Sequence, residues 1–116
     1  MTLFKDDDFV REFKEVQQRT HRIAVSKGFW EDREKKNFGE QIALMHSELS
    51  EALEANRKSL QSEKIPGFSG EEEELADLLL RIMDTAEGNG LRVAEAALAK
   101  MVYNASRPYK HGGKRY

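Results

Sequence analysis

The sequence predicts an all-α fold, a four-helix bundle-like subunit within a single domain over residues 1–116. Apolar side chains recur every three to four positions in four segments, which is the spacing that places them on one face of a helix. Glycine, proline and serine separate these segments, and no segment alternates apolar and polar residues as a strand would. The length of 116 residues also fits one domain with one hydrophobic core.

The first predicted helix covers residues 6–27. Its start has three aspartates, Asp6 to Asp8, and carboxylates are favourable near the free N–H groups and the positive dipole end of a helix. Gly28 suits its end. Its apolar face consists of Phe9, Phe13, Val16, Ile23 and Ala24. Residues 29–36 are predicted to form a connector that begins with two aromatic residues.

The second predicted helix starts between Asn37 and Glu40 and runs to about Ser59. Its apolar stripe consists of Ile42, Met45, Leu49, Ala52 and Leu53. Residues 60–70 contain one proline and two glycines, and this composition predicts a loop.

The third predicted helix begins after Ser69, a capping hydroxyl that precedes four glutamates, and Gly88 and Gly90 end it. Its apolar positions cover more than one face, so we expect it to be the most buried helix. A fourth helix is predicted over residues 91–105, followed by a non-helical basic tail. Because several apolar surfaces are broader than one small bundle needs, we expect the subunit to be oligomeric.

The composition excludes several classes of protein. The chain has no cysteine, which excludes disulfide scaffolds, thiolate zinc sites and cysteine nucleophiles. It has no apolar run near the ~20 residues that cross a bilayer. Its first residues also lack the basic-then-apolar pattern of a secretory signal. We therefore expect a cytoplasmic protein with no membrane partner.

The net charge of −2 conceals an uneven distribution. Residues 40–87 carry twelve acidic and four basic side chains, net −8, whereas residues 88–116 carry one acidic and six basic side chains, net +5. Binding a metal ion together with a phosphate requires an acidic and a basic surface, although charge also simply covers helices. Nucleic-acid binding would need a broader basic surface, so we expect no nucleic-acid partner.

Two pairs of carboxylates are the most informative feature. Glu48 and Glu51 lie on the second predicted helix, and Glu74 and Asp77 lie on the third. The two residues of each pair are three positions apart, so both side chains of a pair project from one face of their helix. Both pairs border apolar stripes, where like charges are costly without a counter-ion. A hard divalent cation such as Mg²⁺ prefers oxygen ligands and fits this arrangement.

Two alternatives compete with a magnesium site. A solvated acidic face with i, i+4 partners would use the same residues without a metal ion. A di-iron bundle requires a glutamate three positions before a histidine on its inner helices. The residues three positions before the three histidines are Gln18, Ala43 and Pro108, so the di-iron site is excluded.

The basic end of the chain is the natural partner for phosphate groups. Lys100 and Asn104 are one helical turn apart and share a face, and two consecutive glycines allow close backbone approach. The candidate phosphate-binding residues are Lys100, Asn104, Arg107, Lys110 and Lys114. The competing interpretation is a disordered basic terminus.

Three further residues carry expectations. A nucleobase would stack on Trp30 or on Phe29, although Trp30 is equally suited to anchor the first helix on the second. Asn37 is expected to cap the second helix rather than to read a base. Arg81 is expected to pair with Asp77 or with Asp84.

At these residues the chain resembles a small single-domain branch of the MazG-like all-α nucleoside triphosphate pyrophosphohydrolases. That family has an ExxE motif on one helix and an ExxD motif on the next, which here are Glu48-Leu-Ser-Glu51 and Glu74-Leu-Ala-Asp77. The resemblance extends over residues 28–116, including the tail KMVYNASRPYKHGGKRY. Ser47 stands where many members have a further glutamate, which leaves open the number of metal ions and the identity of the carboxylate that activates water.

The resemblance implies a Mg²⁺-dependent enzyme, with Mn²⁺ as a substitute, that cleaves a (d)NTP between its α and β phosphates. The products would be a (d)NMP and pyrophosphate, in a role of cleansing the nucleotide pool. Glu48, Glu51, Glu74 and Asp77 would be the metal ligands and catalytic residues, with Glu51 as one candidate for the proton acceptor. A homodimer or homotetramer is also implied. The alternative function is a non-catalytic helical module whose acidic face binds a basic partner.

Overall fold

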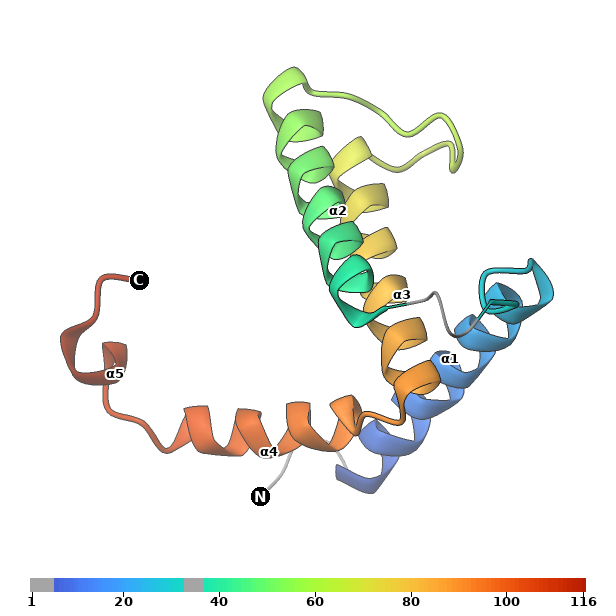
Figure 1. Cartoon of the computed structure of the whole chain (residues 1–116). Coiled ribbons are helices and arrows are strands. Elements are labelled where there is room, and N and C mark those ends of the chain that lie inside the picture. Colours follow the sequence, from blue (N-terminus) through green and yellow to red (C-terminus); the bar gives the residue numbers. More distant parts are fainter. Residues whose placement is uncertain (1–5, 33–36) are drawn as a thin grey trace.

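The computed structural model describes residues 6–32 and 37–116, and this part of the chain is all-helical. It contains α1 (Asp6–Ser26), α2 (Phe38–Lys58), α3 (Gly70–Asn89), α4 (Val93–Ala105) and the short α5 (Lys110–Gly113), as Figure 1 shows. The predicted all-α class is confirmed, and the four long helices lie close to their predicted bounds. None of the described helices combines the length and the apolar composition that a membrane crossing requires.

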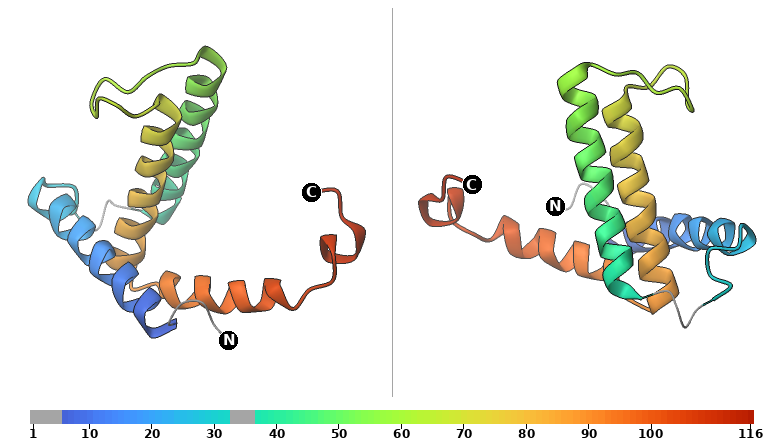
Figure 2. Two further views of the ribbon diagram at one scale, coloured as in Figure 1. Left: turned by 180° about the vertical axis from the view of Figure 1, so that it is seen from behind. Right: turned by 45° about the horizontal axis from the view of Figure 1, so that its top comes forward.

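Helix α3 is the centre of the arrangement. It packs along α2 as an antiparallel hairpin, and its C-terminal half packs across α1 (Figures 1 and 2). It has more buried residues than any other described helix, as its broad apolar surface predicted. Helix α4 contacts α1 and then leads away from the other helices.

The helix ends follow local capping chemistry. The Asn37 side chain accepts a hydrogen bond from the Glu40 backbone N–H at 2.7 Å, which confirms the expected cap of α2. Ser69 and Glu72 form a reciprocal capping box at the start of α3. Gly90 ends α3 in the left-handed conformation, with φ at 67°. Gly88 does not end this helix as expected, because it lies inside it.

The loop between α2 and α3 is held by backbone and side-chain hydrogen bonds. The Gly70 N–H donates to the Leu60 carbonyl at 2.8 Å, and the Ser62 N–H donates to the Phe68 carbonyl at 3.0 Å. The Ser62 hydroxyl also donates to a Glu73 carboxylate oxygen. These contacts fix the loop that carries Lys64.

The apolar core of the described residues is small. Its buried apolar side chains are Ala52, Ala55, Met83, Ala86 and Ala94. No large side chain in the described ranges is fully buried, and many leucines remain about half exposed. The radius of gyration of 16.8 Å exceeds the roughly 13 Å expected of a compact chain of this length.

The tail after α4 was predicted to be non-helical. It forms one short helical turn, α5, in which His111 and Gly112 adopt left-handed backbone angles, with φ at 52° and 88°. The segment is therefore a tight turn rather than a regular helix.

Candidate functional site

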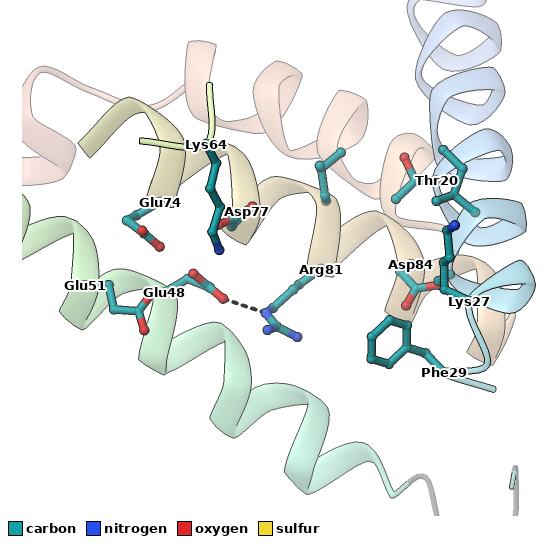
Figure 3. A pocket seen from close by; sticks show the side chains of 13 residues that line it. Thr20, Lys27, Phe29, Glu48, Glu51, Lys64, Glu74, Asp77, Arg81 and Asp84 are labelled. Carbon is teal, nitrogen blue, oxygen red and sulfur yellow. Dashed lines mark hydrogen bonds and ion pairs between the residues drawn. The ribbon is translucent and has the colours of Figure 1, made fainter. Parts of the chain in front are cut away.

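A cavity of about 500 Å³ lies where α1, α2, α3 and the loop between α2 and α3 meet. One half of its wall is acidic and is formed by α2 and α3 (Figure 3). The other half comes from the C-terminal end of α1 and from Phe29, which follows it.

The acidic half contains all four carboxylates that the sequence singled out, namely Glu48, Glu51, Glu74 and Asp77, which we call the acidic cluster. The i, i+3 spacing aligns each pair on its own helix, and the antiparallel hairpin brings the two pairs face to face. Glu48, Glu74 and Asp77 each offer an oxygen within 4.8 Å of the others. Glu51 lines the cavity but lies outside this set of three.

Glu48 is the most constrained member of the acidic cluster. Its side chain is almost fully buried, at 6% exposure, and its Oε1 accepts a hydrogen bond from Arg81 Nε at 2.9 Å. Arg81 was expected to pair with Asp77 or Asp84, and the contact with Glu48 corrects that expectation: Arg81 reaches across to α2 instead of pairing along α3. The second carboxylate oxygens of Glu48 and Glu74 are buried without a hydrogen-bond partner.

The pKa values in the acidic cluster reflect crowded negative charge. Burial, followed by the neighbouring carboxylates of Glu48 and Glu51, raises the pKa of Glu74 to about 8. Burial, followed by the charges of Glu48 and Glu73, also raises the pKa of Asp77. Burial acts to raise the pKa of Glu48, but Arg81 and the other cluster members outweigh it and the net direction is down. A cation at this position would therefore favour the ionised forms of Glu74 and Asp77.

A hard divalent cation would satisfy this arrangement. Buried carboxylate oxygens without partners are costly, and converging oxygens from two helices offer ligands to an ion that prefers oxygen. Glu48 is too buried for a fully solvated acidic face, the competing interpretation, but Arg81 already provides one counter-charge for it.

The α1 half of the cavity was not anticipated from the sequence. Thr20, Ile23, Ala24 and Lys27 line it, as does Phe29, whose side chain is 68% exposed. Lys64 also lines the cavity, and its side chain extends toward the carboxylates in Figure 3. The helical periodicity of α1 predicted only that Ile23 and Ala24 pack against other helices. No sequence pattern indicated that Lys64, a single lysine in a loop, would line a cavity.

Trp30 packs against α3. Its indole Nε1 donates to Asp84 at 2.9 Å, and its ring meets the ring of His21 edge-on at 4.9 Å. A Cβ on Gly88 would stand only 2.1 Å from the indole. Trp30 therefore anchors the end of α1 on the third helix, not on the second, and Phe29 is the aromatic residue that faces the cavity.

The five candidate phosphate-binding residues lie elsewhere. None of Lys100, Asn104, Arg107, Lys110 and Lys114 is among the described residues that line the cavity. Lys100 Nζ lies 4.5 Å from the centre of the Tyr103 ring, and Arg107 lies over the same ring at 5.5 Å. Within one subunit, the structure brings the carboxylates together but not the carboxylates and the basic end.

The chain was compared with models of protein families, with curated proteins and with solved structures, and none of the three comparisons gives a match.

Proposed function

We propose that the protein is a Mg²⁺-dependent nucleoside triphosphate pyrophosphohydrolase of the MazG-like type. The observation that carries this proposal is the acidic cluster, in which two buried carboxylate oxygens without partners face a cavity of about 500 Å³. A cavity of this size is within the range of small-molecule sites, and its acidic and apolar halves match the two ends of a metal-bound nucleotide.

Glu48, Glu74 and Asp77 would hold the ion, because their oxygens already converge and two of them lack partners. When bound, Mg²⁺ would neutralise phosphate charge and lower the pKa of a coordinated water. Arg81 donates its Nε–H to one oxygen of Glu48, and the other oxygen would be available to hold the ion.

Glu51 is the candidate general base. It lines the cavity and is exposed there, and it lies outside the set of three converging carboxylates. Its carboxylate can therefore accept the proton of a water that attacks the α-phosphorus. Hydrolysis by water requires no cysteine or serine nucleophile.

The α1 half of the cavity would take the nucleoside. Phe29 offers an exposed ring for stacking, and Ile23 and Leu80 offer apolar contact. Lys64 and Lys27 also line the cavity and would contact the phosphates. We further propose that the enzyme acts as a homo-oligomer in the cytoplasm and cleanses the (d)NTP pool.

The test is incubation of the purified protein with Mg²⁺, or with Mn²⁺, and a panel of canonical and modified NTPs and dNTPs. Release of pyrophosphate and nucleoside monophosphate is expected. In water enriched in ¹⁸O, the label should enter the monophosphate, because water attacks the α-phosphorus. Release of orthophosphate instead of pyrophosphate, or no release of pyrophosphate from any substrate with either metal, would contradict the proposal.

The matched control separates catalysis from binding. Glu51→Gln should abolish turnover while the protein stays folded, whereas Glu54→Gln, one turn farther along α2 and outside the acidic cluster, should leave turnover unchanged. A non-catalytic module with an acidic face would show no turnover in any variant and would instead bind a basic peptide.

A further inference from the structure

The C-terminal arm, which we define as α4 and all residues after it (93–116), is basic and points away from the cavity of its own subunit. It carries five basic side chains and one acidic side chain, net +4. In Figure 1 the arm leads to the left, whereas the α1 end and the loop after α2 that line the cavity lie on the right. Its cations therefore have no anionic partner at the site of the same chain.

The direction of the arm is set by packing at its base. Ala94 is 1% exposed, Lys14 of α1 pairs with Glu95 at 3.5 Å, and the Leu91 N–H donates to the Ala86 carbonyl at 2.9 Å. Lys100 and Asn104 lie on the same continuous helix, so they cannot turn toward the cavity unless α4 leaves α1. Lys100 and Asn104 therefore cannot reach the cavity of their own subunit while α4 stays packed on α1.

The isolated subunit exposes more surface than a compact monomer. Its accessible surface is 9190 Å², whereas a compact monomer of this mass exposes about 6,400 Å². The excess of about 2,800 Å² exceeds the roughly 800 Å² per partner of a standard interface and suits an obligate dimer.

Much of the apolar part of this surface lies on the hairpin of α2 and α3. We call its four half-exposed leucines, which are 47–60% exposed, the leucine stripe: Leu49, Leu53, Leu75 and Leu79. Each follows a member of the acidic cluster by one or two positions, and therefore lies about 100° to 200° around its helix from that carboxylate. The hairpin thus has an acidic side toward the cavity and an apolar side away from it.

We infer that a second copy of the chain packs on the leucine stripe, and that the C-terminal arm of each subunit completes the cavity of the other. The α2–α3 hairpins of two subunits, packed through their leucine stripes, would form a layer of four helices. The cavity of each subunit would then lie on the outer side of this layer. Helices pack 8–10 Å apart, and α4 with its thirteen residues is about 20 Å long. An arm that starts at one hairpin can therefore cross the partner hairpin and reach its far side, where the partner's cavity opens.

Charge complementarity favours the partner's C-terminal arm as the segment that covers the mouth of the cavity. The arm carries net +4, while the acidic cluster and the phosphates of a nucleotide are both anionic. Lys100, Asn104 and Arg107 would then bind the phosphates of the substrate held by the partner. This inference rests on the proposed function for its substrate, but its structural part can be tested without any turnover.

The structural test uses cross-linking between isotopically distinct chains. Equal amounts of ¹⁴N- and ¹⁵N-labelled protein are exchanged and treated with a carbodiimide, which joins lysines to nearby carboxylates. Because half of the exchanged dimers are mixed, about half of the peptides that link Lys100 or Lys110 to a peptide of the acidic cluster should contain one light and one heavy partner. Links from Lys64 should join peptides of the same label and serve as the internal control. Arm-to-cluster links with only matched labels would overturn the inference.

The functional test mixes two inactive variants, Glu51→Gln and the double variant Lys100→Ala/Arg107→Ala. In a two-fold dimer with exchanged arms, half of the dimers are mixed and one of their two sites is intact, so about a quarter of the wild-type activity should return. Sites completed within one subunit would return none. This second result would overturn the inference while the activity of the wild type still supported the proposed function.

A reciprocal mixture sharpens the same distinction. Wild type is mixed with a chain that carries all three substitutions. Exchanged arms inactivate both sites of a mixed dimer, so activity should fall to about a quarter of that of wild type alone. A fall only to about one half would contradict arm exchange.

Discussion

The two sides of the α2–α3 hairpin reverse the usual distribution of polarity. On the cavity side, Glu48 is buried at 6% exposure and lies among three other carboxylates. On the opposite side, Leu53 is 60% exposed and the other leucines of the stripe are nearly half exposed. Buried charge is costly, and exposed leucine leaves apolar area in water. The comparison teaches that neither side is optimised for the isolated subunit: the acidic side suits the proposed cation, and the apolar side suits the inferred second chain.

The largest expected effect is on the acidic side. Glu51→Gln removes the proposed proton acceptor and should lower kcat by roughly 10²–10⁴-fold. Because Glu51 is exposed, the thermal midpoint should change little. Pyrophosphate release and circular dichroism measure the two quantities. A variant that kept turnover would assign the proton transfer to another group.

On the apolar side, Leu53→Glu combined with Leu79→Glu should break the assembly, because four charges would meet at a two-fold interface. Sedimentation velocity should show a monomer, and turnover should be lost with the dimer. Val16→Glu is the control, because Val16 is similarly exposed, at 48%, but lies on α1 outside the stripe. A double variant that stayed dimeric would move the interface to another surface.

A smaller effect is expected where the cavity wall is anchored. Gly88→Ala places a methyl group against Trp30 and should cost about 1–3 kcal/mol of unfolding free energy. Gly39→Ala in α2 meets only the Asn37 side chain, at 3.3 Å, and should change the unfolding free energy by less than about 1 kcal/mol. Urea denaturation of both variants measures the difference. Equal effects would mean that the indole can move away.

The smallest effect concerns the pH dependence of stability. The pKa of Glu74 is raised from 4.5 to about 8, so its proton favours the folded state. This contribution is fully present below pH 4.5 and is lost as the pH rises to about 8. In EDTA, the Tm of the wild type should therefore fall by a few degrees more than that of Glu74→Gln between pH 5 and pH 9. Mg²⁺ at pH 9 should restore the wild type alone, and parallel curves would argue against the raised pKa.

Features encoded by local spacing could be predicted from the sequence. The caps at Asn37 and Ser69 depend on residues three positions apart, and so does the alignment of each carboxylate pair. The meeting of the two pairs required only that consecutive helices form an antiparallel hairpin. These parts of the fold and of the candidate site appear in the structure as expected.

Features that depend on distant parts of the chain could not be predicted in this way. Arg81 pairs with Glu48, thirty-three positions earlier, and Trp30 bonds to Asp84, fifty-four positions later. Phe29 lines the cavity because of the way α1 crosses α3, and Lys64 lines it because the loop between α2 and α3 folds back over the hairpin. Helical periodicity orders the faces of one helix but does not determine the crossing of two.

The small alanine core described above has a consequence for how the chain reaches its folded state. Alanines and one methionine bury little apolar area, and burial contributes only about 25 cal/mol per Å². Most of the apolar burial of the proposed dimer occurs only when two leucine stripes meet. Folding and association would then be a single bimolecular event, so that the melting temperature rises with protein concentration and an unpaired chain stays open to proteolysis.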